Sequence, residues 1–195
     1  MSESPKIVLA SSSPYRKTLL ERLCIPFETT SPEVDESPIP GESQEQLVIR
    51  LACLKADAVA KSWSDALIIG SDQVAVLGDT VLGKPGTRAN ALKQLQSMRG
   101  NSVFFLTGLC LLNVATQNRQ IDLVRYEVEF RDFDDSEIER YLDRDEPYNC
   151  AGSFKSEQLG IALMRRMQGE DPTALIGLPL IRLAEMLRQE GFQLP

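Results

Sequence analysis

Three successive serines stand at the start of a predicted helix, directly after the short apolar run at residues 7–10. The order Ser13-Pro14 favours a helix that begins at Pro14, because serine caps helix N-termini and proline suits the first helical position. The free N–H groups and the positive dipole end of such a helix attract phosphate. Ser11, Ser13 and, one turn into the helix, Arg16 are therefore candidate phosphate ligands, although an ordinary capped helix has the same pattern.

A lone carboxylate, Asp72, follows the apolar run at residues 66–70. This run predicts a buried strand, and α/β enzymes place their chemistry beyond the carboxyl ends of such strands. Gly70 would let a ligand approach the backbone closely. Asp72 is thus a candidate for the chemical step, and the alternative is an aspartate that simply starts a turn.

Two loops carry lysines, and the lysine of the first loop is a candidate for contact with a phosphate. Lys84 stands between Gly83 and Pro85, just after a predicted hairpin turn, and the proline stiffens this loop. Lys155 stands in the glycine-led loop at residues 152–157. An ammonium group meets a phosphate as a point charge, although most lysines in such loops are simply solvated.

The chain contains no histidine. Serine–histidine triads, Cys–His pairs and HExxH zinc sites are thereby excluded, so a general base has to be a carboxylate, Lys, Tyr or Cys. No two of the four cysteines have the Cys-x-x-Cys spacing of zinc ribbons and thioredoxin-like proteins. A catalytic metal is therefore expected to take oxygen ligands, as Mg²⁺ or Mn²⁺ does.

The net charge of −7 over 195 residues argues against a protein that coats nucleic acid, because such binding needs a broad basic face. A small polyanion needs only a few convergent cations or a metal ion. No apolar run approaches the ~20 residues of a membrane span, and the N-terminus does not read as a secretory signal. We expect a soluble, cytoplasmic protein with reduced cysteines and with neither a membrane nor a nucleic acid as partner.

Apolar periodicity, capping residues and turn residues predict the elements that position these groups. Ser43 and Gln46 form a capping box before one helix, and Asp134 or Asp135 caps another. Mixed strands and helices without a linker or repeat predict one α/β domain over residues 1–195, with a mixed sheet. We expect strands near residues 7–10, 27–30, 66–70 extended by 74–77, 103–114, 121–131 and 161–164, helices near 15–24, 44–61, 88–98, 135–143 and 180–190, and simple turns at 169–172 and 177–179.

Several sequence blocks occur together and in one order along the chain. The blocks are Leu9-Ala10-Ser11-x-Ser13-Pro14-x-Arg16, Asp35-Glu36, Leu51-Ala52-x-x-Lys55-Ala56, Gly70-x-Asp72, Gly83-Lys84-Pro85, Ala151-Gly152 and Gly177-Leu178-Pro179. With these blocks the sequence resembles, over essentially its whole length, the Maf family of nucleotide pyrophosphatases. The resemblance implies a single elongated α/β domain with a twisted mixed sheet, flanking helices and a central cleft, as in Maf and ITPase-like folds. It also implies a nucleotide substrate, a divalent cation and a homodimer.

The roles of site residues follow from this resemblance, position by position. Asp72 matches the catalytic carboxylate that accepts a proton from the attacking water. Glu36 matches an acidic site residue and, with Asp72, is expected to bind the metal. The phosphate-binding residues implied by the family are Ser11, Ser13, Arg16, Lys55, Lys84 and Lys155.

Substrate choice also follows from the resemblance. Maf enzymes specific for dTTP and UTP carry Arg, Thr and Gln where this chain has Tyr15, Gln73 and Glu157. The set here resembles the branch that hydrolyses 7-methyl-GTP, although that branch usually has Trp at the position of Tyr15. An aromatic face and a carboxylate suit a cationic methylated guanine. The alternatives are a pyrophosphatase for dTTP, UTP or another modified nucleotide, and a nucleotide-binding regulator of cell division.

Overall fold

The computed structural model describes residues 5–195 and contains a seven-stranded sheet in the order β2-β1-β3-β5-β6-β7. β1 is parallel to β2 and β3, the following neighbours are antiparallel, and β4 forms a hairpin with β3. This mixed sheet confirms the expected α/β class. The strands are β1 (Lys6–Ala10), β2 (Glu28–Thr30), β3 (Ala66–Leu77), β4 (Thr80–Leu82), β5 (Ser102–Asn113), β6 (Arg119–Phe130) and β7 (Met164–Gly169).

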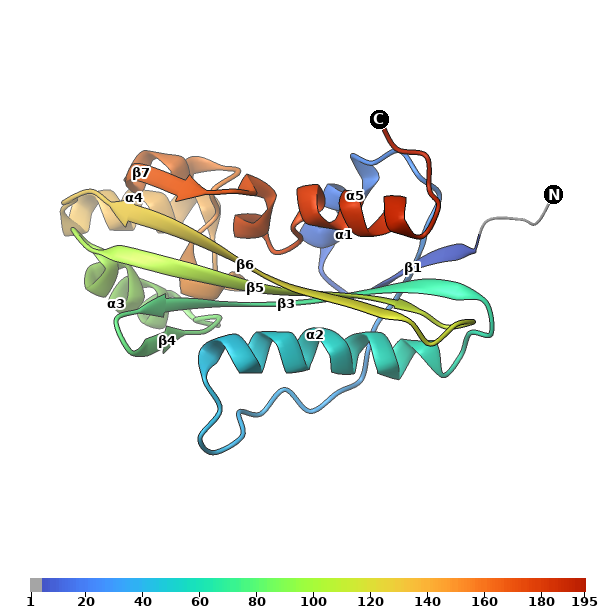
Figure 1. Cartoon of the computed structure of the whole chain (residues 1–195). Helices are drawn as coiled ribbons and strands as arrows, with labels where there is room; N and C mark the ends of the chain where they lie inside the picture. The colour runs from blue at the N-terminus through green and yellow to red at the C-terminus, as the bar shows by residue number, and fades with distance from the viewer. Residues whose placement is uncertain (1–4) are drawn as a thin grey trace.

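Helices cover both faces of the sheet in an elongated molecule (Figure 1). α2 lies along one face, α1 and α5 lie against the other, and α3 and α4 pack at one end. No helix within residues 5–195 is both long and apolar enough to cross a membrane. The helices are α1 (Pro14–Glu21), α2 (Gln44–Ala60), α3 (Arg88–Met98), α4 (Asp135–Asp145) and α5 (Leu180–Gln189), with short 3₁₀ helices η1 (Ala151–Ser153), η2 (Leu159–Leu163) and η3 (Pro172–Ile176).

The predicted helix starts are confirmed by capping hydrogen bonds. The Ser13 side chain caps α1, and Pro14 occupies its first turn. Ser43 and Gln46 make both hydrogen bonds of the capping box before α2. Of the two aspartates considered for α4, Asp134 is the cap. These starts depend on groups within three residues of one another, which is why the sequence predicts them.

α2 packs directly on the sheet because two glycines leave space for its backbone. A Cβ atom at Gly70 would lie 2.0 Å from the carbonyl oxygen of Ala52, and one at Gly108 would lie 2.3 Å from that of Val48. The expectation that Gly70 admits a ligand is therefore wrong, since the backbone of α2 occupies that space. This close contact fixes the side chains of α2 relative to those of β3.

Replacing Gly70 with Ala should lower the free energy of unfolding by about 1–3 kcal/mol, because the methyl group would push α2 away from the sheet. Gly83→Ala is the matched control, since a Cβ atom there meets nothing within 4 Å. Urea unfolding followed by circular dichroism measures both variants. Equal stability of the two variants would contradict the tight packing described here.

β3 runs without interruption through residues 71–73, so Asp72 lies inside the strand and not at its end. The strand is continuous from Ala66 to Leu77, and Asp72 pairs with Gly108 of β5. The polar residues 71–73 interrupt the apolar pattern, but their backbones still pair in the ladder. Asp72 is thus held by a regular strand, although a strand end was predicted.

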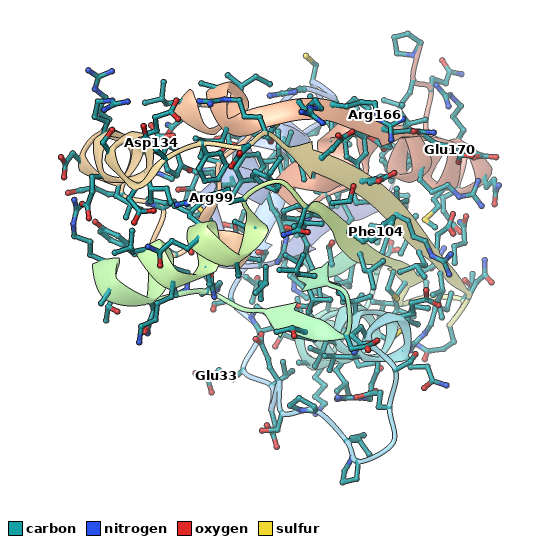
Figure 2. The ribbon with its side chains drawn as sticks, turned by 90° about the vertical axis from the view of Figure 1, so that its left-hand side faces the viewer. Glu33, Arg99, Phe104, Asp134, Arg166 and Glu170 are labelled. Atoms are coloured by element: carbon teal, nitrogen blue, oxygen red, sulfur yellow. The ribbon has the colours of Figure 1, made fainter. Side chains whose placement is uncertain are left out.

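The strand expected at residues 161–164 is wrong. These residues belong mainly to η2, and β7 begins at Met164. A short apolar run does not distinguish a helical turn from a strand. β7 is instead a polar strand at the sheet edge, joined to β6 by backbone pairing and by ion pairs of Arg165 and Arg166 with Glu129 (Figure 2 labels Arg166). Its residues therefore lack the apolar alternation that sequence patterns detect.

Candidate active site

A cavity of about 640 Å³ opens at a gap along one edge of β3. β3 pairs with β1 as far as Gly70 and with β4 from Ala75 onward. Within the described residues, positions 71–74 have no strand on that edge, and Asp72, Gln73 and Val74 line the cavity there. Asp72 therefore lies beyond the carboxyl end of β1, the parallel neighbour, where α/β sheets commonly bind ligands. The remaining wall comes from the loop before α1, the middle of α2, and loops at residues 83–84, 149–157 and 175–176.

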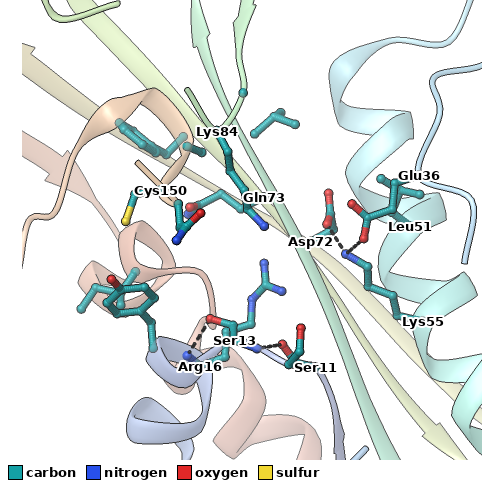
Figure 3. Close-up of a pocket in the computed structure, with 18 of the residues that line it drawn as sticks. Ser11, Ser13, Arg16, Glu36, Leu51, Lys55, Asp72, Gln73, Lys84 and Cys150 are labelled. Atoms are coloured by element: carbon teal, nitrogen blue, oxygen red, sulfur yellow. Dashed lines mark hydrogen bonds and ion pairs between the residues drawn. The ribbon is translucent and has the colours of Figure 1, made fainter. Parts of the chain in front are cut away.

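Lys55 of α2 joins two carboxylates in this cavity. Its Nζ lies 2.5 Å from Oδ1 of Asp72 and 2.7 Å from Oε1 of Glu36 (Figure 3). Gly70 and Asp72 point to the same face of β3, and Ala52 and Lys55 are neighbours on α2. The contact between Gly70 and Ala52 thus brings Lys55 to Asp72. The Lys55 and Asp72 side chains are 7% and 11% exposed, whereas Glu36, on the loop before α2, is 57% exposed.

The cations of the cavity affect the ionisation of its carboxylates. Burial disfavours the charge of Glu36, but the hydrogen bond and charge of Lys55, with the charges of Lys84 and Arg16, hold the Glu36 pKa below its ordinary value. Burial lowers the pKa of Arg16, and the charges of Asp72 and Glu36 act in the opposite direction. Three cationic and two anionic side chains thus converge here, which suits a polyanionic ligand.

The serine loop before α1 is ordered by its own hydroxyl oxygens. Ser11 Oγ accepts a hydrogen bond from the Ser13 N–H at 3.1 Å, and Ser13 Oγ accepts one from the Arg16 N–H at 3.4 Å (Figure 3). Because both oxygens act as acceptors in these contacts, each hydroxyl keeps its hydrogen for a ligand oxygen. The predicted combination of two serines, Arg16 and a helix N-terminus is thus present on the cavity wall.

Gln73 points to the opposite face of β3 from Asp72. Its Nε2 donates to the Ala174 carbonyl at 2.6 Å and to the Thr107 hydroxyl at 3.0 Å. The Thr107 hydroxyl donates to the same carbonyl at 3.0 Å, so it has to accept from Gln73. This network fixes the amide orientation and leaves Oε1 of Gln73 as an acceptor for a ligand.

Gly177 contributes to the site although residues 177–179 were interpreted only as a turn. Its carbonyl oxygen accepts from Nε of Arg16 at 2.8 Å and from Oγ of Ser71 at 3.0 Å. The single hydroxyl hydrogen of Ser71 is shared with the Gly108 carbonyl, whose oxygen lies 2.9 Å from Oγ, and the Ser71 side chain is buried. The Gly177 carbonyl therefore orients the guanidinium of Arg16, and Ser71 helps to hold this carbonyl in place. The only sequence signal was for Gly177, from its place in a block shared with the Maf family, since Ser71 is an unspecified position in its block.

Tyr15 and Glu157 line the cavity and also border a neighbouring pocket of about 280 Å³. Burial, followed by the nearby Cys150 thiol and the Glu157 carboxylate, raises the pKa of Tyr15 to about 12, so the phenol stays neutral at pH 7. Glu157 is exposed, as is Lys84 on another part of the wall. Cys150 lines the cavity beside Tyr15 and was not anticipated as a site residue.

Lys155 differs from the other predicted site residues because it does not line the cavity. Its ammonium group donates to the carbonyl oxygen of Asp145 at the end of α4. Its backbone N–H donates to the Tyr141 hydroxyl at 3.1 Å. A contact between Lys155 and phosphate would require the ammonium group to leave Asp145. All the other predicted site residues share the same cavity wall.

Asp72 and Glu36, which share the contact with Lys55, could offer oxygen donors to a divalent cation. Within residues 5–195, no cluster of three or more Asp, Glu, Cys or His side chains is arranged to hold a metal. Mg²⁺ fits the pair nevertheless, because it commonly binds one or two carboxylates, keeps several waters and takes further oxygens from substrate phosphates. The arrangement suits hydrolysis of a phosphoanhydride.

Comparison with known proteins identifies relatives of this chain. Three relatives named 7-methyl-GTP pyrophosphatase, from Nitrosococcus oceani, Methylobacillus flagellatus and Pseudomonas aeruginosa, are 54%, 56% and 53% identical to this chain. The alignments cover 96%, 96% and 98% of this chain and 94%, 97% and 100% of theirs. Among solved structures, the Staphylococcus aureus Ham1 protein aligns with 64% of this chain and 71% of its own, at 18% identity and a TM-score of 0.46. A family model described as Maf-like protein matches residues 6–190, and the chain belongs to the Maf family.

Proposed function

We propose that this protein is a nucleotide pyrophosphatase that hydrolyses 7-methyl-GTP to 7-methyl-GMP and pyrophosphate. Family membership and the names of the three relatives support this function. One structural observation carries it: the buried Lys55–Asp72 pair lies in a cavity also lined by Arg16 and Lys84. A carboxylate suits activation of water, and convergent cations suit a polyphosphate.

In the proposed reaction, Asp72 accepts a proton from a water molecule that attacks the α-phosphorus. The bond between this phosphorus and the oxygen that bridges to the β-phosphorus breaks, and its electron pair leaves with pyrophosphate. The chain contains no histidine that could act as the base. Among the carboxylates that line the cavity, Asp72 is the least exposed. Its position in a regular strand restricts movement of its backbone during proton transfer.

The phosphates are proposed to bind at the N-terminus of α1 and to the surrounding cations. Ser11 and Ser13 donate hydroxyl hydrogen bonds, and Arg16 offers the guanidinium N–H groups that Gly177 does not use. Lys55 and Lys84 offset negative charge that builds up on the leaving group. A divalent cation, held by the carboxylates of Asp72 and Glu36, supplies further charge neutralisation when bound.

We propose that Tyr15, Gln73 and Glu157 recognise the base. The 7-methylguanine ring is cationic, so it favours stacking on the Tyr15 ring and a hydrogen bond to the Glu157 carboxylate. Oε1 of Gln73 would accept from an N–H group of the base edge. Tyr15 adjoins Arg16 and Gln73 adjoins Asp72, so these side chains can contact the base while their neighbours contact phosphate.

We also propose that the protein is a homodimer and that it is located in the cytoplasm. The dimer rests on the family resemblance, and light scattering of the purified protein tests it. The cytoplasmic location is supported by Cys24, Cys53, Cys110 and Cys150, all of which are free thiols, as is usual in a reducing compartment.

The proposed activity is tested by pyrophosphate release from a panel of nucleotides that includes 7-methyl-GTP, GTP, dTTP and UTP. The highest kcat/KM is expected for 7-methyl-GTP, with the monophosphate and pyrophosphate as products. In ¹⁸O-labelled water, the label should appear on the monophosphate, because the attack is at the α-phosphorus. A primary release of orthophosphate, or a preference for dTTP or UTP, would reject the proposed reaction or substrate respectively.

Converting Tyr15, Gln73 and Glu157 together to Arg, Thr and Gln should reduce the preference for 7-methyl-GTP over UTP and dTTP. The expected change in the ratio of kcat/KM values is roughly tenfold to a hundredfold, the range for loss of one charge-assisted hydrogen bond. Glu157→Gln alone tests the carboxylate, and Glu170→Gln, at an exposed position outside the cavity, is the matched control. An unchanged ratio in a folded triple variant would show that these residues do not recognise the base.

A further inference from the structure

Lys55 occupies the space between the two carboxylates that are proposed to hold the metal. Its Nζ contacts Oδ1 of Asp72 at 2.5 Å and Oε1 of Glu36 at 2.7 Å, and Figure 3 shows both contacts converging on the ammonium group. Charge-assisted hydrogen bonds from an ammonium to a carboxylate are about 2.7–2.9 Å long, so the Glu36 contact is within this range and the Asp72 contact is shorter. The site thus contains a cation that belongs to the protein itself.

A divalent cation on the same carboxylate oxygens would lie next to this ammonium group. Mg²⁺ binds oxygen at about 2.0–2.1 Å, so its charge would stand close to that of Lys55. The Lys55 side chain is only 7% exposed, so water and salt screen this repulsion poorly. Arg16 adds a further positive charge, because it also faces Asp72 and Glu36.

Building on the proposed function, we propose that Lys55 and the divalent cation compete for Asp72 and Glu36, and that the cation enters together with the nucleotide. Without nucleotide, Lys55 contacts both carboxylates, offsets part of their charge and keeps the metal site weak. When a triphosphate binds, its oxygens offer the ammonium group new partners, and the carboxylates become available to the metal. Lys55 is then both a phosphate ligand and a device that orders metal binding after substrate binding.

The lysine side chain suits this exchange chemically. Its ammonium group has three donors and no fixed plane, so it can move between carboxylate and phosphate oxygens without a change in its own protonation. Its four-carbon stem is flexible, whereas the backbone of α2 is held on the sheet at Gly70. Movement of the side chain alone therefore accomplishes the exchange.

A competing arrangement leaves Lys55 in place and puts the metal on the second oxygen of each carboxylate. In that arrangement Lys55 orients both carboxylates, and its removal would leave the affinity for metal unchanged or weaken it. Under competition, removal of Lys55 strengthens metal binding instead. The two arrangements thus predict opposite effects of the same substitution.

The experiment measures Mn²⁺ binding to the nucleotide-free protein from the electron paramagnetic resonance signal of free Mn²⁺. Lys55→Met removes the charge and keeps the approximate length of the side chain. Lys55→Gln also removes the charge but keeps a hydrogen-bond donor for the carboxylates. It therefore provides a second test if Lys55→Met does not fold. Lys84→Met is the matched control, because it removes a charge from the same cavity without a direct contact to Asp72 or Glu36.

The Kd for Mn²⁺ is expected to fall at least about tenfold in both Lys55 variants and less than about threefold in Lys84→Met. A non-hydrolysable α,β-methylene analogue of 7-methyl-GTP should strengthen Mn²⁺ binding more in the wild type than in the Lys55 variants. Unchanged or weaker Mn²⁺ binding in folded Lys55 variants, or an equal gain in Lys84→Met, would overturn the competition. Absence of pyrophosphate release by the wild type would reject the proposed function separately, since the Mn²⁺ measurement without nucleotide does not depend on turnover.

Discussion

Replacing Asp72 with Asn should lower kcat for 7-methyl-GTP hydrolysis by about 10²–10⁴-fold while the protein stays folded, because a general base contributes roughly this factor. The asparagine side chain has nearly the same size, and its Oδ1 can still accept a hydrogen bond from Lys55. The amide cannot accept a proton from water at neutral pH. The loss should therefore appear in kcat, whereas binding of a non-hydrolysable analogue should change less.

Steady-state pyrophosphate release and analogue binding measure these two effects. Asp79→Asn is a suitable control, because Asp79 is an exposed residue of the turn between β3 and β4 and lies outside the cavity. Thermal unfolding checks that neither variant is partly unfolded. Near-normal turnover by Asp72→Asn would remove Asp72 from the role of proton acceptor.

Removal of divalent cations should reduce activity by at least about a hundredfold, because a metal ion stabilises phosphoryl charge by several kcal/mol and each 1.4 kcal/mol is tenfold. The protein is dialysed against EDTA, assayed in metal-free buffer, and then titrated with Mg²⁺ or Mn²⁺. Either ion should restore activity, since the available ligands are carboxylate oxygens. Full activity in metal-free buffer would contradict a metal-assisted reaction.

Glu36, on the loop before α2, connects the requirement for a divalent cation to the cavity. Glu36→Gln should raise the Mg²⁺ concentration needed for half-maximal activity, because it removes one of the two proposed carboxylate ligands. Glu33→Gln is the matched control, since Glu33 is exposed on the same loop (Figure 2) and is not among the residues that line the cavity. Equal Mg²⁺ requirements in both variants would exclude Glu36 as a ligand.

The sequence by itself determined the elements whose formation depends on nearby residues. The starts of α1, α2 and α4 follow from caps at Ser13, Ser43 and Asp134, which bond to groups three residues away. The long β5–β6 pair follows from its extended apolar patterns on either side of a turn. The candidate phosphate loop and Asp72 could be identified because helix starts and strand positions restrict where ligands bind.

The tertiary structure decided which of these groups meet and which do not. Lys55 reaches Asp72 because α2 rests on Gly70 and Gly108, and Arg16 is held by the carbonyl of a residue 161 positions away, Gly177. β7 forms through backbone pairing with β6, and Lys155 is withdrawn to Asp145. None of these contacts leaves a local pattern in the sequence. They arise because packing of distant segments, and the need of buried polar groups for partners, select one arrangement among many that the local preferences allow.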